Sequence, residues 1–156
     1  NGDVEDIEWM RASASIPIAS RPVKLGGKRL LDGGVSDPIP VKWMLSRGYE
    51  KNVVVLTRDV KYRKKANPKM QLFLKAVLHK YPAFLKDLEE RHIHYNETLE
   101  ELSALEKEGR IHIIRPSSPI QAAMIERDES NLERIYQTGR ADMKKDLEKL
   151  KAYLDS

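Results

Sequence analysis

The sequence predicts an α/β fold with a helical C-terminal extension, and three patterns lead to this prediction. Residues 53–56 and 111–114 are short apolar runs, which are typical of buried strands. Residues 68–81, 85–102 and 132–154 carry apolar side chains at steps of three and four, as amphipathic helices do. Of the 156 residues, 40% are hydrophobic and 33% are charged, which suits one globular domain with exposed helices.

The composition excludes some classes of function. The chain has no cysteine, so neither disulfides nor thiolate metal sites can form, and the redox compartment stays open. Its formal net charge of +4 permits contact with acidic surfaces without demanding nucleic acid. No apolar run approaches the ~20 residues of a membrane-spanning helix. We expect no nucleic-acid partner, and among compartments we favour the cytoplasm.

The first expected element is a helix over residues 5–14, which have helical apolar spacing. Pro17 ends it, because proline cannot continue a helix. Ser13 and Ser15 are candidate nucleophiles by residue type. Neither stands between glycines on a strand-to-helix turn, so we interpret both as small packing residues.

A hairpin and a second helix come next. Gly26-Gly27 predicts a two-residue turn between strands at 23–25 and 28–31. Asp37-Pro38 pairs a capping residue with a first-turn proline, and so predicts the start of a helix. Gly48 ends that helix.

The rest of the chain is expected to alternate strands with long helices. Residues 52–57 are apolar at successive positions, which predicts a strand covered on both faces in a parallel sheet. The basic run 61–65 is interpreted as a solvated loop that can also contact anionic lipid headgroups at a membrane surface. Further elements are helices over 68–80, 83–107 and 130–154, a strand at 111–114, and a capping box at Ser130–Glu133.

Asp32 is the strongest candidate for a catalytic residue in this sequence. It follows the apolar pair Leu30-Leu31 at the expected strand end and precedes Gly33 and Gly34. Glycines adopt backbone angles barred to other residues and let a ligand approach closely. A carboxylate held in this way can act as a general base. The alternative is that Asp32 only caps a turn, as aspartates before glycine often do.

A longer series of motifs resembles the patatin-like phospholipase family, most closely its bacterial members. The resemblance covers roughly residues 8 to 60 in order, which makes it far more specific than a lone Asp-Gly-Gly. It rests on Ala12-Ser13-Ala14-Ser15-Ile16-Pro17, Pro22-Val23, Gly26-Gly27, Leu30 to Gly34, and Pro38-Ile39-Pro40-Val41.

The resemblance implies a fragment of a three-layer α/β/α sheet and a serine lipid acyl hydrolase. Asp32 would be the base of a Ser-Asp dyad, and Gly33 and Gly34 would shape the turn beside the substrate. The substrate would be a phospholipid-like acyl ester, with neither a metal nor an organic cofactor. Residues 1–65 would be the C-terminal part of the catalytic domain, and residues 66–156 a helical extension with the short strand at 111–114.

One departure from the family pattern concerns the nucleophile. The family carries its serine in a Gly-x-Ser-x-Gly elbow upstream of the aspartate, and no two glycines of this chain stand four apart. We therefore interpret the chain as the C-terminal half of a longer enzyme, inactive alone. The missing half would expose a strand edge, so we also expect the isolated chain to self-associate.

The histidines offer two other chemistries. His92 and His94 form a His-x-His, but on a helix the two rings lie about 200° apart, which disfavours a shared zinc ion. A Ser–His–Asp triad could use His92, His94 or His112 after Asp32. The family resemblance favours the dyad, in which no histidine takes part.

A function from another class also remains open. The chain could be a non-catalytic interaction domain that docks through its long helices or through the basic segment 61–65. An esterase assay of the protein that contains the missing half would separate this reading from the enzyme.

Overall fold

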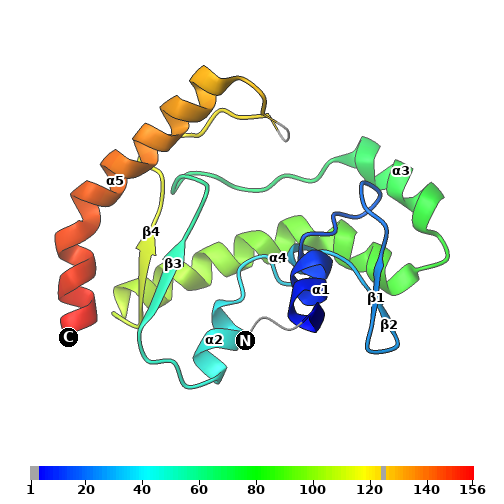
Figure 1. Ribbon diagram of the computed structural model, residues 1–156, viewed down its shortest axis with the longest axis horizontal. Helices are drawn as coiled ribbons and strands as arrows, with labels where there is room; N and C mark the ends of the chain where they lie inside the picture. Colours follow the sequence, from blue (N-terminus) through cyan, green and yellow to red (C-terminus); the bar gives the residue numbers. More distant parts are fainter. Residues whose placement is uncertain (1–3, 124–125) are drawn as a thin grey trace. The chain divides into compact units, whose positions relative to one another are not determined.

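A computed structural model describes residues 4–123 and 126–156 (Figure 1). In chain order its elements are α1 (Val4–Ser13), β1 (Val23–Leu25), β2 (Lys28–Leu30), η1 (Gly33–Val35, a 3₁₀ turn), α2 (Val41–Ser46), β3 (Asn52–Val55), α3 (Pro68–Leu78), α4 (Pro82–Lys107), β4 (Ile111–Ile114) and α5 (Glu129–Asp155). The chain is thus mixed α/β, as predicted. None of the helices described is long and apolar enough to cross a membrane.

The chain forms two compact units. The first contains the residues up to Pro40 together with Lys65–Tyr95, and the second contains Val41–Lys64 together with Asn96–Ser156. Helix α4 therefore contributes its first half to one unit and its second half to the other. The sequence-based domain boundary after residue 65 stays a prediction.

In the first unit a hairpin packs against α1. Strands β1 and β2 are antiparallel, with Val23 opposite Leu30. Gly26 and Gly27 have φ values of 56° and 73°, the left-handed pair that a tight hairpin turn requires. The buried apolar side chains of this unit are Ala12, Val23, Val35 and Leu74.

In the second unit β3 and β4 form a parallel pair, with Asn52 opposite Ile111 and Val55 opposite Ile114. Leu102 of α4 is fully buried, and its exposed fraction is 0%. The Tyr153 hydroxyl of α5 accepts the Asn52 N–H at 2.8 Å and donates to the Arg110 carbonyl at 3.0 Å. This hydroxyl therefore joins the first residue of β3 to the residue that precedes β4.

Helix α5 has two further attachments to the residues around β4. His112 Nε2 lies 2.5 Å from Asp146 Oδ2, and the His112 ring stacks on Tyr153 with centroids 5.7 Å apart. The Ser117 N–H donates to Asp142 Oδ2 at 2.9 Å, and this bond is the main cause of the lowered pKa of Asp142. His112 is therefore hydrogen-bonded and mostly buried, with 13% of its side chain exposed.

Three sequence-based details are wrong. Residues 52–57 are not covered on both faces: Val53 is 41% and Val55 is 68% exposed on one face of β3, whereas Asn52 on the other face is buried. Asp37-Pro38 does not open a helix, since α2 begins at Val41. The cap of α5 is not Ser130 but Asp128, whose side chain accepts the N–H groups of Ser130 and Asn131.

The sheet itself is smaller than the family resemblance implied. The described strands form two separate two-stranded sheets, β1-β2 and β3-β4. The three-layer α/β/α arrangement therefore remains a prediction.

Candidate functional site

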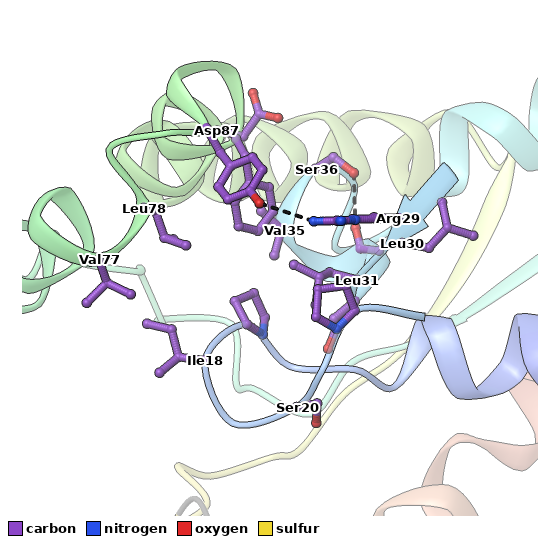
Figure 2. A pocket seen from close by; sticks show the side chains of 16 residues that line it. Ile18, Ser20, Arg29, Leu30, Leu31, Val35, Ser36, Val77, Leu78 and Asp87 are labelled. Carbon is purple, nitrogen blue, oxygen red and sulfur yellow. Dashed lines mark hydrogen bonds between the residues drawn. The ribbon is translucent and has the colours of Figure 1, made fainter. Parts of the chain in front are cut away.

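A pocket of about 550 Å³ lies in the first unit (Figure 2). Asp32 is one of the residues that line it. Most of its lining is apolar, which suits a hydrocarbon ligand held by few polar groups. The lining residues are Pro17, Ile18, Ser20, Pro22, Arg29, Leu30, Leu31, Asp32, Gly33, Val35, Ser36, Val77, Leu78, Tyr81, Phe84 and Asp87.

The turn after α1 forms one wall of this pocket. The Ser20 N–H donates to the Ile16 carbonyl at 2.9 Å, which closes the turn. Within it Ile18 has φ of 72°, a left-handed backbone that is rare for a β-branched residue. Backbone strain of this kind gathers at ligand sites. Ile18 lines the pocket, so the strained residue stands where a ligand would bind.

The chain after β2 carries Asp32 past α1. The Asp32 N–H donates to the Ser15 carbonyl at 2.8 Å, and the Ser15 hydroxyl donates to the Arg11 carbonyl at 2.8 Å. Ser15 is buried, with 5% of its surface exposed. Its hydroxyl therefore has a structural role, as the sequence indicated, and its carbonyl fixes the start of the Asp-Gly-Gly turn.

The Asp32 carboxylate caps that turn. Its Oδ1 accepts the Gly34 N–H at 2.7 Å and so holds the first bond of η1. The capping role that the sequence left as an alternative is therefore present in the structure. A carboxylate has about four acceptor positions, and this bond uses one of them. Capping thus orients the carboxylate in the pocket wall and is compatible with proton transfer.

The two glycines differ in what surrounds them. A Cβ on Gly34 would lie 3.0 Å from Asp32 Oδ1 and 3.6 Å from Arg91 Nη2, so a larger residue here would press on the Asp32 carboxylate. A Cβ on Gly33 would meet nothing within 4 Å. Neither residue has positive φ, because both lie in the 3₁₀ turn. The expectation of special backbone angles here was wrong, whereas the close approach at Gly34 is real.

Arg91 of α4 also holds the Asp-Gly-Gly turn, and the sequence analysis did not identify it. Its Nε donates to the Gly34 carbonyl at 2.7 Å, and the side chain is half-buried. The turn is therefore held from both sides, by Asp32 at the Gly34 N–H and by Arg91 at the Gly34 carbonyl. Its partner is a backbone atom 57 residues away, and no local pattern could have indicated that pairing.

The histidines lie apart from this pocket, since none is among its lining residues. His92 Nδ1 contacts the Glu89 carbonyl at 2.9 Å, and His94 Nε2 lies 3.5 Å from Glu90 Oε2. Within residues 4–123 and 126–156 no group of three or more metal-ligating side chains gathers. Both of these contacts lie within α4.

Two family models match parts of the chain. Residues 3–45 match the model described as patatin-like phospholipase, and residues 81–155 match one described as a domain of unknown function (DUF6363). No curated protein matches the chain. The first match spans α1, the hairpin and Asp32, and it ends earlier than the resemblance over residues 8 to 60. Through its N-terminal residues 3–45 the chain is similar to patatin-like phospholipases, a family of lipid hydrolases.

Proposed function

We propose that this chain supplies the aspartate of a Ser-Asp dyad that hydrolyses carboxylic esters of phospholipid-like lipids. One observation carries the proposal: within the segment similar to patatin-like phospholipases, Asp32 stands in the wall of an apolar pocket. The pocket volume of about 550 Å³ lies in the range of small-molecule sites. Its apolar walls would hold the acyl chain and leave the ester beside the carboxylate.

The aspartate would work by proton transfer. Asp32 would take the proton of a serine hydroxyl as its oxygen attacks the ester carbonyl carbon, and the resulting carboxyl group would return that proton to the departing alcohol. In the second half Asp32 would deprotonate the water that attacks the acyl-serine and would return the proton to the serine. Atoms and protons balance over the two halves, and no cofactor takes part.

The serine and the oxyanion-binding N–H groups would come from residues outside these 156, because the chain has no Gly-x-Ser-x-Gly. The chain alone should therefore not hydrolyse esters. Such oxyanion donors matter because the loss of one typically slows turnover by ~10²–10³-fold. Within the chain, Gly34 and Arg91 would keep the Asp32 turn in place.

The test is to replace Asp32 by asparagine in a protein that joins this chain to its serine-bearing half. We expect turnover of short acyl esters to fall by roughly 10⁴-fold, the loss seen for the aspartate of a serine triad. Asp37→Asn is the matched control, because Asp37 is exposed and does not line the pocket. Equal activity of Asp32→Asn and Asp37→Asn would refute the role of Asp32.

The rival proposal is a non-catalytic docking domain. It draws support from α5, a helix of 27 residues in which no described side chain is buried. An ester-inert parent protein would favour this rival over the hydrolase.

A further inference from the structure

The outward face of α3 is unusually apolar for a short surface helix. Four of its side chains are large, apolar and exposed over about half or more of their surface: Met70 at 50%, Leu72 at 72%, Phe73 at 49% and Val77 at 48%. Met70, Phe73 and Val77 share one side of the helix with Leu74, which is buried. Leu72 lies on the opposite side. The three exposed side chains therefore form an apolar stripe that continues from the buried Leu74 to the surface.

The helix is well formed at its start. The Asn67 side chain accepts the Met70 N–H at 3.1 Å, and Pro68 occupies the first turn. With 11 residues it is about 16 Å long. A partner would therefore meet a helix that is already ordered.

The chain segment that carries this face is basic, and carboxylates of α4 lie beside it. From Lys65 to Lys86 the chain contains five lysines and neither aspartate nor glutamate. Lys75 pairs with Glu89 at 3.0 Å and Lys86 with Glu90 at 3.9 Å, both on α4. The other three, Lys65, Lys69 and Lys80, form no ion pair with any residue that the structure describes.

We propose that α3 is an interfacial helix that docks on an anionic lipid bilayer. Exposed leucine and phenylalanine beside lysines is the composition of helices that lie in the headgroup region. The apolar side chains would enter the acyl boundary while Lys69 and Lys80 contact anionic headgroups. A second copy of the same face would instead bring lysines against lysines, which repel.

The docking face is continuous with the pocket. Val77 belongs to the exposed face of α3 and also lines the pocket (Figure 2). Tyr81, just beyond the helix, is 50% exposed and is likewise a lining residue. A bilayer that covers α3 would therefore reach the pocket lining at these two residues. The docking itself does not depend on the proposed catalysis, so it can be tested with the chain alone.

The experiment is co-sedimentation of the 156-residue chain with vesicles. We expect binding to vesicles of phosphatidylcholine mixed with phosphatidylglycerol, and much weaker binding to phosphatidylcholine alone. Met70→Ser combined with Phe73→Ser should weaken binding at least tenfold, because it removes two apolar side chains from the contact. Lys69→Gln combined with Lys80→Gln should weaken it by about fivefold per lysine at low salt, since each cation is attracted by the surface potential.

The matched control is Tyr136→Ser combined with Leu154→Ser on α5, whose side chains are 58% and 50% exposed. This pair should bind like the original chain, and circular dichroism should show that all variants are folded. No binding to the anionic vesicles would overturn the proposal, and so would equal binding by the α3 and α5 variants. The proposal would also be overturned if the chain formed dimers, did not bind vesicles, and lost its dimers in the double serine variant of α3. That result would identify a second copy of the chain as the occupant of this face.

Discussion

Gly34 is the residue that contacts both side chains holding the Asp-Gly-Gly turn of the candidate site. Its N–H binds Asp32 Oδ1, its carbonyl binds Arg91 Nε, and its missing side chain leaves room for both. The sequence could indicate Asp32 and the glycines, because an aspartate before two glycines is a local pattern. It could not indicate Arg91, because the arginine meets a backbone carbonyl far away in the chain.

Gly34→Ala should disturb the carboxylate more than the fold. The new Cβ would lie 3.0 Å from Asp32 Oδ1, so the carboxylate must shift by a few tenths of an ångström and its bond to the Gly34 N–H is strained. We expect a large loss of esterase turnover in the serine-containing parent and a loss of about 1–3 kcal/mol in the free energy of unfolding of the chain.

The control for this change is Gly33→Ala, where a Cβ has room. It should retain most of the turnover and stability. Equal effects of the two substitutions, measured by ester hydrolysis and thermal melting, would contradict the proposed importance of space at Gly34.

Arg91→Ala should destabilise the chain by about 1–3 kcal/mol, because it leaves the half-buried Gly34 carbonyl without its charged donor. Arg91→Lys should restore little, since an ammonium group cannot reproduce the position of Nε. Thermal melting measures both changes. Lys86→Ala, which removes only an exposed ion pair of 3.9 Å on the same helix, should have a small effect. A melting temperature of Arg91→Ala that matches Lys86→Ala would count against the role of Arg91.

At the level of elements, the long periodic helices and the short apolar strands were predictable, but the cap of α5 was not. Strand β4 occupies the predicted residues 111–114, and α3 and α4 begin within a residue of the predicted positions. The start of α5 was placed at Ser130, because Ser130-Asn131-Leu132-Glu133 matches a capping box. Asp128 caps the helix instead, since its carboxylate reaches two N–H groups at once.

The segment that leads into α5 should loosen only at strongly acidic pH. The pKa of Glu126 is lowered from 4.5 to about 2, mainly by the Asp128 N–H, then by the Asn131 side chain and the Arg127 N–H. Because the folded pKa lies below the unfolded one, these bonds stabilise the cap fully above pH 4.5 and are lost as the pH falls through about 2.

An NMR titration of the Asp128 amide proton would follow this change. Its shift should move with an apparent midpoint near pH 2 and should be insensitive to pH in Glu126→Gln. A midpoint near 4.5 would show that the carboxylate is not held by these donors.

At the scale of the whole molecule, the sequence could identify strands but not how many would assemble. Residues 53–56 are apolar at successive positions, a pattern that normally belongs to a strand covered on both faces. In the structure Val55 is exposed and β3 pairs only with β4 among the described strands. The pattern correctly indicated the parallel pairing. The exposed face of β3 would have to be covered by other residues or by another chain.

The isolated chain should therefore self-associate through this sheet. A parallel pair with apolar side chains at an open edge favours pairing with another strand. Val55→Lys should reduce the association, because a lysine at an edge opposes strand pairing. Sedimentation velocity over a range of concentrations measures this, and a monomer at the highest concentration would rule it out.

The two hydrogen bonds of Tyr153 have a consequence for the stability of the β3-β4 sheet. The hydroxyl of Tyr153 serves the N–H of Asn52 and the carbonyl of Arg110 together. Loss of this one ring would leave both groups without their shared partner. Strands β3 and β4 would then loosen together, although both lie far from Tyr153 in the sequence.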